Sequence, residues 1–422
     1  MKIPENLLAG KRILLGVSGS IAAYKSLELV RLYVKAGAEV KVVMTDAAMR
    51  FVGPLSFETL SRNEVLHSGN ESWSTRHNHI QSAEDADVMV IAPATANTIA
   101  KLANAVADNL LLQCALAFPG VKLLAPSANT NMLKHPITQA NLKMLGVAHY
   151  EIVATQTKEL ACRTTGDGAM AEPPEIFWQT ARLLLKDDFW SHRRVVVTGG
   201  GTIERIDDVR YLSNFSSGKM ASALATALFL RGADVNLIAT RFDDGLPQAM
   251  HTLEVESGEE MGEYLTDSIR IAKKGMMSKP SLITDEPIHL IQKTPYLFMA
   301  AAVGDYVPAH PQYGKLKKET LGETWNLELK QSRDLIASVD KTGIKSVAFK
   351  AEFDEASALE NAKKALHAKG VDAVCLNVLG HKNGFGGDTN AVTFVTGTAQ
   401  EALPENDKLS VALEILDRAA AL

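Results

Sequence analysis

The sequence predicts an α/β protein with two doubly wound parallel-sheet domains in succession. Two short apolar runs, Arg12–Val17 and Val195–Val197, end in turns of glycine and small residues. An apolar helical pattern and a second strand follow each run, which is the βαβ order of a parallel sheet. Because this order restarts at Arg194, we expect two separate domains, and 422 residues are enough for both.

Composition and charge exclude several classes of protein. Hydrophobic residues make up 46% of the chain and charged residues 22%, as in an ordinary globular protein. The net charge of -5 gives no electrostatic reason to expect nucleic acid or a membrane as partner. No apolar run approaches the ~20 residues of a membrane span, and the first residues lack a secretory signal. The three cysteines, Cys114, Cys162 and Cys375, lack metal-ligand spacing, which indicates reduced thiols in a cytoplasmic protein.

The first domain is expected over residues 1–186. Its predicted strands are Arg12–Val17, Ala38–Met44, Val88–Ala92 and Val121–Ala125, and its helices are Ile21–Ala36, a segment ending near Ala103, Asp108–Phe118 and Ile176–Lys186. The loops 93–98 and 126–132 follow two of these strands, where doubly wound sheets bind ligands. Residues 156–170 are polar and contain glycine and Cys162, which favours a mobile flap over an element of the sheet.

The second domain is expected over residues 194–422, after a short charged linker at 187–193. Its predicted strands are Val195–Val197, Asp234–Ala239, Tyr296–Ala302, Ser346–Phe349, Ala373–Leu376 and an edge strand at Ala391–Val395. Its predicted helices are Ala221–Leu230, Gly258–Ile271, Glu355–Lys369 and Lys408–Ala420. Residues 273–293 are irregular and predict a surface insertion.

Two turns near the start of the second domain predict anion binding. Gly199–Gly201 follows a buried strand, so backbone amides there can approach a phosphate. The turn Ser213–Lys219 precedes a helical pattern, where Ser216 or Ser217 is the expected N-cap and the free amides attract an anion. A triple glycine alone is about as often only a tight turn, but the two turns together favour a phosphorylated ligand.

Several motifs occur together in a fixed order along nearly the whole chain. They are GVSGSIAAYK (Gly16–Lys25), His79-Ile80, APATANTIAKLA (Ala92–Ala103), ADNLL (Ala107–Leu111), PSANTNM (Pro126–Met132), LAC (Leu160–Cys162), DDVRYLSNFSSGKM (Asp207–Met220), AAVGDY (Ala301–Tyr306), GKLKK (Gly314–Lys318), AFKAE (Ala348–Glu352) and GFGGDTNAV (Gly384–Val392). In these motifs the chain resembles the bifunctional coenzyme A biosynthesis flavoproteins, which fuse phosphopantothenoylcysteine decarboxylase to phosphopantothenate–cysteine ligase. Each motif alone is weak evidence, but their joint order is specific.

The resemblance implies a flavodoxin-like domain that binds FMN, followed by a Rossmann-like ligase domain that binds CTP with Mg²⁺. The ligase half would convert the carboxylate of 4′-phosphopantothenate to an acyl-cytidylate, which the amine of L-cysteine attacks with release of CMP. The decarboxylase half would use FMN to oxidise the cysteinyl thiol to a thioaldehyde, which loses CO₂ and is then reduced to 4′-phosphopantetheine. The residues implied to hold FMN are Ser18, Gly19, Ser20, Thr45, Pro93, Ala94, Thr95 and Asn97.

Three catalytic residues are implied in the first half, each with a structural alternative. His79 would be the base, since histidine can titrate near neutral pH, although surface histidines are common and His77 lies close by. Asn129 would orient the substrate carboxylate, although asparagine also shapes turns. Cys162 would donate a proton to the enethiolate, although most lone cysteines are buried apolar side chains. The residues after it, Arg163–Thr165, depart from the Gly-Asp usual in the family.

In the second half the resemblance assigns Asn214 and Lys315 to formation or use of the acyl-cytidylate. Lysine runs such as Lys315–Lys318 are more often solvated loops, but here the charge would close over a triphosphate. Contacts to CTP or phosphopantothenate are implied for Arg210, Ser216, Ser217, Gly218, Lys219, Met299, Ala300, Ala301, Asp305, Lys315, Arg333, Asp334, Leu335, Ile336, Phe349 and Lys369. Asp305 would hold cytidine or metal, or alternatively cap a helix, and no other residue is assigned to the metal.

Two other functions remain open. A non-catalytic flavin-fold regulatory subunit would lack part of the histidine, asparagine and cysteine set that this chain retains. An NAD(P)-dependent oxidoreductase would need a GxGxxG turn and an acidic residue after the second strand, which here ends in Ala239-Thr240-Arg241. The resemblance further implies small-molecule substrates and a homo-oligomer, as large as a dodecamer, with trimeric contacts among flavin domains and dimeric contacts among ligase domains.

Overall fold

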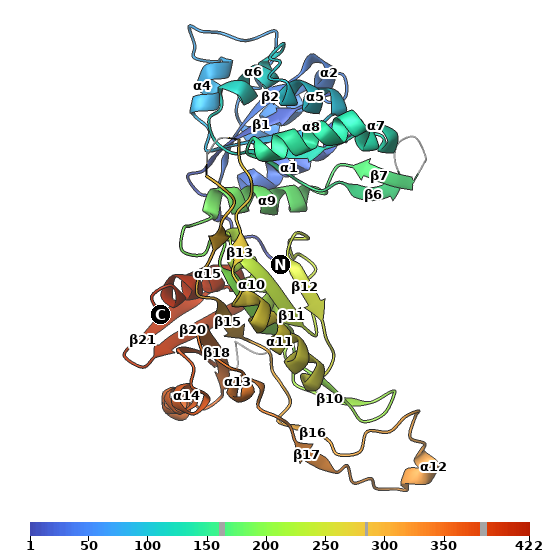
Figure 1. Cartoon of the computed structure of the whole chain (residues 1–422), viewed down its shortest axis with the longest axis vertical. Coiled ribbons are helices and arrows are strands. Elements are labelled where there is room, and N and C mark those ends of the chain that lie inside the picture. The colour runs from blue at the N-terminus through green and yellow to red at the C-terminus, as the bar shows by residue number, and fades with distance from the viewer. Residues whose placement is uncertain (160–164, 283–285, 380–385) are drawn as a thin grey trace. The chain divides into compact units, whose positions relative to one another are not determined.

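The computed structural model describes residues 1–159, 165–282, 286–379 and 386–422. Cys162, Gly384 and Phe385, which carry part of the sequence argument, lie outside the described residues. Contacts divide the chain into two compact units, and Figure 1 labels many of their elements. The N-terminal unit contains Ile3–Lys186 and Met277–His289, and the C-terminal unit contains Met1–Lys2, Asp187–Met276 and Leu290–Leu422.

The N-terminal unit is built on a five-stranded parallel sheet of order β2-β1-β3-β4-β5. The strands are β1 (Arg12–Val17), β2 (Glu39–Met44), β3 (Val88–Ala94), β4 (Lys122–Pro126) and β5 (Tyr150–Ile152). This order is flavodoxin-like, and its winding reverses between β1 and β3. Every residue of β3 is buried, as expected for a strand covered on both faces. The reversal places a ligand crevice at the carboxyl ends of β1 and β3.

Polar residues that begin helices surround this crevice. The helices of the unit are η1 (Ile21–Tyr24), α1 (Lys25–Lys35), α2 (Asp46–Met49), α3 (Pro54–Ser61), α4 (His79–Glu84), α5 (Ala96–Ala103), α6 (Leu110–Ala117), α7 (Thr130–Lys134), α8 (Pro136–Val147) and α9 (Pro173–Leu185). The side chains of Ser20, Thr45, Thr95 and Asn109 cap η1, α2, α5 and α6 by accepting backbone N–H groups. The loops that the sequence predicts after these strands therefore lead directly into helices, whose first turns they cap.

Residues 156–170 contain more regular structure than the sequence predicts. β6 (Gln156–Glu159) and β7 (Thr165–Ala169) pair as an antiparallel two-stranded sheet. The pair lies outside the five-stranded sheet, as expected, although its two strands were not predicted. An exposed hairpin needs only backbone hydrogen bonds, so its polar sequence carries no apolar alternation.

The C-terminal unit contains an eight-stranded sheet of order β12-β11-β8-β15-β18-β19-β20-β21. The strands are β8 (Arg194–Gly199), β11 (Asp234–Ala239), β12 (His251–Glu254), β15 (Tyr296–Met299), β18 (Lys345–Glu352), β19 (Ala373–Val378), β20 (Thr389–Thr396) and β21 (Gln400–Asp407). The first six strands in this order are parallel and follow the Rossmann arrangement 3-2-1-4-5-6. The winding reverses between β8 and β15, where a nucleotide crevice is expected.

The edge of this sheet differs from the prediction. β20, predicted as the edge strand, is internal, because the antiparallel strand β21 continues the sheet beyond it. In β21 only Leu403 is buried, so its sequence QEALPEND has no apolar pattern to predict a strand.

Helices cover both faces of the C-terminal sheet. They are α10 (Lys219–Leu230), α11 (Gly258–Ala272), α12 (Lys318–Leu321), α13 (Leu335–Ser338), α14 (Glu355–Lys369) and α15 (Lys408–Ala419). Val196 packs in one core cluster with apolar residues of α11 and α14. Its neighbours in β8 point to the opposite face, because side chains alternate along a strand. α10 contacts β8 and also packs against α15.

The remaining strands form short pairs, and the one at residues 276–277 spans the division between the two units. The strands are β9 (Ile203–Arg205), β10 (Tyr211–Ser213), β13 (Met276–Met277), β14 (Leu290–Ile291), β16 (Tyr306–Pro308) and β17 (Leu329–Gln331). Residues 187–193 pack within the unit, where Trp190 is buried with its ring 4.9 Å from that of Tyr296. The division of the chain at 187–193 stays a prediction. None of the described helices combines the length and the apolarity that crossing a bilayer requires.

Candidate active sites

The crevice of the N-terminal unit is a cavity of about 660 Å³ at the carboxyl ends of four strands. It is lined by Ser18, Gly19, Ser20, Thr45, Asp46, Ala47, Thr95, Ala96, Asn97, Thr98, Lys101, Asp108, Asn109, Ser127, Ala128 and Met132. Most residues predicted to hold FMN belong to this set. Pro93 and Ala94 do not, because both are buried in β3. Lys101, Asp108 and Asn109 were not predicted, although they lie in two of the sequence motifs.

Hydrogen bonds fix the loops of this cavity to one another. The hydroxyl of Ser18 donates to the carbonyl of Pro93 (2.7 Å) and accepts the amide of Thr95 (3.1 Å). The hydroxyl oxygens of Ser20 and Ser127 are 3.0 Å apart. α5 begins at this edge, so its N-terminal amides and its partial positive charge favour an anion there. The hydroxyls, the helix N-terminus and the volume suit a phosphorylated flavin.

Gly19 allows two of these loops to approach closely. A Cβ at this position would lie 2.5 Å from the Cβ of Ala47, which is far inside van der Waals contact. The loop after β1 and the loop after β2 therefore meet only because residue 19 has no side chain.

A second cavity of about 730 Å³ adjoins the first, since Ser20, Ser127 and Ala128 line both. Asn129 lines the second cavity. It also begins α7, where its side-chain oxygen accepts the amide of Asn131 (3.0 Å). Asn129 can thus shape the turn before α7 and also face a substrate in the second cavity.

His79 lies apart from both cavities. It is the first residue of α4, and its Nδ1 is 2.7 Å from a carboxylate oxygen of Glu71. The ring of Trp73 contacts it edge-on at a centroid distance of 5.6 Å. Among the described residues that line either cavity, His79 is absent. Neither of these two described cavities therefore contains both His79 and Asn129, and Cys162 lies outside the described residues.

The C-terminal unit has a cavity of about 410 Å³ beside the carboxyl ends of β15 and β18. Of the predicted nucleotide contacts, Met299, Ala301, Asp305, Arg333, Asp334, Leu335, Ile336, Phe349 and Lys369 line it. Gln331, Ser332 and Lys350 also line it and were not predicted, although Lys350 lies in the AFKAE motif. Three cationic side chains and one aromatic ring suit a nucleoside triphosphate.

Short contacts order the loops around this cavity. The amide of Ser332 donates to the carbonyl of Asp305 (2.9 Å), and its hydroxyl donates to the carbonyl of Gly304 (2.5 Å). Asp334 caps α13 by accepting the amide of Ala337 (3.1 Å). Lys369 Nζ is 3.6 Å from a carboxylate oxygen of Asp334. The helix-cap alternative considered for Asp305 is wrong, because the strand β16 follows it.

Asn214 lies at the border of the nucleotide cavity. Its Nδ2 donates to the carbonyls of Ala302 (3.3 Å) and Val303 (3.2 Å), and both of these residues line the cavity. A Cβ at Gly201 would lie 2.5 Å from the carbonyl oxygen of Asn214. The third glycine of the turn after β8 is thus required for this approach.

The Lys315 loop is tied to the Asp207–Arg210 segment. The carboxylate of Asp207 is fully buried and accepts the amide of Leu316 (3.1 Å), and Arg210 donates to the carbonyl of Leu316 (2.6 Å). Burial raises the pKa of Asp207, but backbone N–H groups and Arg210 outweigh it, so the net pKa is lowered. Neither Lys315 nor Arg210 belongs to the described lining of the nucleotide cavity.

The start of α10 corrects another expectation. Its N-cap is Gly218, in the left-handed region at φ +73°, and not Ser216 or Ser217. Gly218 adopts this conformation because it has no side chain. A Cβ there would also lie 2.5 Å from the carbonyl oxygen of Arg241.

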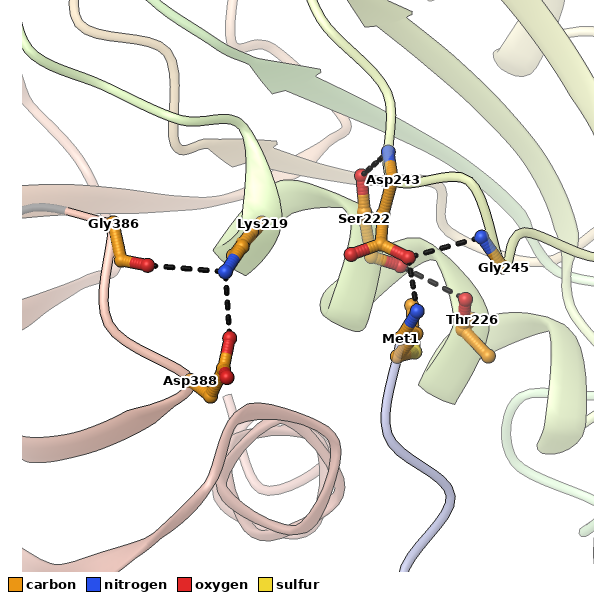
Figure 2. A network of polar contacts seen from close by, with 8 residues as sticks. All are labelled: Met1, Lys219, Ser222, Thr226, Asp243, Gly245, Gly386 and Asp388. Atoms are coloured by element: carbon orange, nitrogen blue, oxygen red, sulfur yellow. Dashed lines mark hydrogen bonds and ion pairs between the residues drawn. The ribbon is translucent and has the colours of Figure 1, made fainter.

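Lys219 is engaged by the loop before β20. Its Nζ is 2.6 Å from the carboxylate of Asp388 and 3.0 Å from the carbonyl of Gly386, as Figure 2 shows. Lys219 thereby lowers the pKa of Asp388. Figure 2 also shows Asp243, which accepts the amide of Gly245 and contacts the amino nitrogen of Met1. Ser216, Ser217, Gly218 and Lys219 are absent from the described lining of the nucleotide cavity, and their predicted ligand contacts stay predictions.

No three His, Cys, Asp or Glu side chains within the described ranges converge as a preformed metal site requires. Mg²⁺ remains an expectation tied to the nucleotide.

Comparisons with known proteins give the family. The family model "Flavoprotein" matches residues 1–185, and the model "DNA/pantothenate metabolism flavoprotein C-terminal domain" matches 190–278 and 283–422. Two solved structures are similar to parts of the chain. A PPC decarboxylase mutant complexed with pantothenoylaminoethenethiol is 35% identical, over 41% of this chain and 97% of its own (TM-score 0.38). The C-terminal domain of a coenzyme A biosynthesis bifunctional protein CoaBC is 25% identical, over 56% of this chain and 97% of its own (TM-score 0.42).

Full-length relatives are more informative. The coenzyme A biosynthesis bifunctional protein CoaBC of Bacillus subtilis is 36% identical over 425 residues, which is 99% of this chain and 98% of that protein. The protein of the same name from Mycolicibacterium smegmatis is 33% identical over 430 residues, with 98% of each chain covered. Identity of this extent across both units shows that the chain belongs to the family of coenzyme A biosynthesis bifunctional proteins CoaBC.

Proposed function

We propose that this bifunctional enzyme of coenzyme A biosynthesis joins 4′-phosphopantothenate to L-cysteine at the expense of CTP, and then decarboxylates the product to 4′-phosphopantetheine with FMN. The observation that supports it most is the pair of cavities at the carboxyl ends of parallel strands in two separate sheets. One cavity is lined by residues assigned to a flavin, and the other by residues assigned to a nucleotide.

In the decarboxylase half, the phosphate of FMN would lie at the N-terminus of α5 among Ser18, Ser20 and Thr95. When bound, FMN supplies the two-electron oxidation of the cysteinyl thiol that makes CO₂ loss possible. Asn129 would orient the departing carboxylate without adding a charge that opposes its loss. Cys162 would return a proton to the enethiolate.

His79 would accept the substrate proton. Its contact with Glu71 through Nδ1 fixes the ring and leaves Nε2 for the substrate. Since His79 lines neither of the two described cavities, we propose that the homo-oligomer supplies it from a second copy. Mixed oligomers of His79→Ala and Asn129→Ala chains should then recover part of the decarboxylation that each variant lacks, because some sites contain both intact residues. Absence of recovery in oligomers shown to be mixed would contradict this assignment.

In the ligase half, Phe349 would pack on the cytosine base, while Arg333, Lys350 and Lys369 attract the triphosphate with its Mg²⁺. Lys315 would offset the charge that develops as pyrophosphate leaves. Asn214 holds the backbone at the cavity border and would position the acyl-cytidylate.

The test is to incubate the purified enzyme with 4′-phosphopantothenate, L-cysteine, Mg²⁺ and either CTP or ATP, and to identify the products by mass. We expect CMP, 4′-phosphopantothenoylcysteine and 4′-phosphopantetheine with CTP, and a flavin absorbance spectrum from the protein. Equal product formation with ATP would contradict the nucleotide assignment. The homo-oligomer and the cytoplasmic location belong to the same proposal, and the native mass tests the first of them.

A further inference from the structure

Two lysines in the N-terminal unit converge on one carboxylate oxygen. Lys25 Nζ is 2.8 Å from Oε1 of Glu172, and Lys158 Nζ contacts the same oxygen. The three residues come from separate elements: Lys25 begins α1, Lys158 lies in β6, and Glu172 precedes α9. All three line the second cavity, which Asn129 also lines.

The position of Glu172 is unusual for a helix start. It is the N-cap residue of α9, yet its side chain makes no capping hydrogen bond. Its carboxylate contacts the two lysines and not the helix amides. Burial raises the pKa of Glu172, but the hydrogen bonds from Lys158 and Lys25 outweigh it, so the net pKa is lowered. The carboxylate therefore stays ionised and acts as an internal anion between two cations.

One carboxylate does not balance two ammonium groups. A phosphomonoester carries between about −1.5 and −2 charges at neutral pH and offers three acceptor oxygens. It therefore satisfies two lysines better than a single carboxylate does. Glu159 adds a second carboxylate to the described lining, but the hydrogen bonds described for Lys25 and Lys158 both go to Glu172, so Glu172 is the anion that a phosphate would replace.

We propose that Lys25 and Lys158 bind the phosphomonoester of the decarboxylation substrate, and that Glu172 occupies their site until the substrate displaces it. The inference rests on the proposed decarboxylase function, whose substrate and product carry a phosphate at the end remote from the sulfur. The cavity adjoins the flavin cavity, since Ser20, Ser127 and Ala128 line both. A substrate arm that spans the two adjoining cavities would extend from the flavin, past Asn129, to the two lysines.

A purely structural ion pair and a competitor for the phosphate predict opposite effects of neutralising Glu172 on ligand binding. If the carboxylate only holds β6 against α1, its neutralisation disorders the cavity and weakens the binding of every ligand. If the carboxylate competes with the phosphate, its neutralisation removes the competitor and strengthens the binding of phosphorylated ligands alone. Glu172→Gln keeps the size of the side chain and separates the two cases.

The binding experiment measures the dissociation constants of 4′-phosphopantetheine and of pantetheine for the flavin-loaded enzyme by calorimetry. Lys158→Met and Lys25→Met should each weaken binding of 4′-phosphopantetheine by about tenfold or more, as loss of a charge-assisted hydrogen bond implies, and leave pantetheine within about twofold. Glu172→Gln should tighten the binding of 4′-phosphopantetheine several-fold, because the two lysines no longer pair with a carboxylate in the free enzyme. Lys143→Met, an exposed lysine of α8, is the matched control and should change neither ligand.

A second readout is the rate of decarboxylation of 4′-phosphopantothenoylcysteine and of its dephosphorylated form. The lysine variants should raise KM for the phosphorylated substrate alone and leave kcat largely unchanged. The inference would be overturned if the lysine variants weakened the binding of both ligands equally. It would also be overturned if Glu172→Gln bound 4′-phosphopantetheine less tightly than the wild-type enzyme does. A wild-type enzyme that decarboxylates neither substrate would overturn the proposed function instead.

Discussion

Gly19→Ala tests whether the cavity of the N-terminal unit holds the flavin phosphate. The added Cβ would lie 2.5 Å from Ala47 Cβ and 3.0 Å from its carbonyl carbon. Normal carbon–carbon contact starts near 3.5 Å, so the two loops must separate by about 1 Å. A shift of that size stretches a hydrogen bond of ~2.9 Å beyond its useful range. Each charge-assisted hydrogen bond lost to the phosphate costs about 1.5–3 kcal/mol, which weakens FMN binding by roughly 10- to 150-fold.

The measurement is a fluorescence titration of flavin-free protein with FMN, because flavin emission changes on binding. Gly146→Ala is the matched control. It makes the same chemical change inside α8, where an added Cβ meets nothing within 4 Å. The control should bind FMN normally and unfold at slightly higher denaturant, since alanine favours a helix by ~1 kcal/mol over glycine. If Gly19→Ala bound FMN as tightly as Gly146→Ala, the loops after β1 and β2 would not form the phosphate site.

Two further predictions concern the buried polar groups of the units. Tyr33→Phe should lower the free energy of unfolding of the N-terminal unit by about 1 kcal/mol in urea, because it leaves the buried hydroxyl of Thr180 without its tyrosine partner at 2.6 Å. Cys114 and Cys375 should resist alkylation by iodoacetamide at neutral pH and react fully after denaturation, as mass spectrometry would show. Burial raises the pKa of Cys114 to about 12 and that of Cys375 further, so neither forms a thiolate in the folded protein. Rapid labelling of either cysteine in the native enzyme would contradict the packing of α6 or β19.

The sequence predicted those parallel strands that are short apolar runs buried on both faces. It missed the parallel edge strands β5 and β12, in which no residue is buried. Arg12–Val17 and Asp234–Ala239 match β1 and β11 at both ends. The same argument fails for β21, where one buried residue among eight leaves no periodicity. It also fails for β6 and β7, whose pairing depends on backbone hydrogen bonds that have no signature in side-chain type.

The candidate sites were predictable where the fold itself gathers residues. Loops after parallel strands meet at one edge of a sheet, so Ser18, Thr45 and Thr95 meet in the structure. Contacts between distant segments were not predictable in this way. Lys219 and Asp388 are 169 positions apart, and no local pattern indicates that their charges meet. Arg210 likewise contacts Leu316 through a loop whose path the sequence does not reveal.

The Asp207–Arg210 segment suggests a positioning role that an isosteric substitution can test. One oxygen of Asp207 accepts the amides of Val209 and Arg210, and the other accepts the amide of Leu316. Asp208 accepts the amide of Gly314 (2.8 Å). These contacts fix the residues on both sides of Lys315. In Asp207→Asn, one of the two acceptors becomes an NH₂ group that faces a backbone N–H, so one set of contacts must break.

We therefore expect Asp207→Asn to lower kcat of ligation by tenfold or more, since misplacing a catalytic group by about 1 Å costs up to roughly 100-fold. KM for CTP should change little, because the described lining of the nucleotide cavity excludes this loop. Decarboxylation of supplied 4′-phosphopantothenoylcysteine should stay at the wild-type rate. Asp208→Asn is the control, because an amide oxygen can still accept its one bond from Gly314.

Limited proteolysis supplies a readout that does not depend on turnover. Release of the Lys315 loop should make residues 309–328 more susceptible to cleavage in Asp207→Asn than in Asp208→Asn. Faster cleavage with normal kcat would mean that Lys315 does not need this anchor. Equal cleavage and equal kcat in the two variants would mean that the buried carboxylate does not hold the loop. Only reduced kcat, unchanged KM for CTP and faster cleavage together fit a carboxylate that acts on ligation through the position of Lys315.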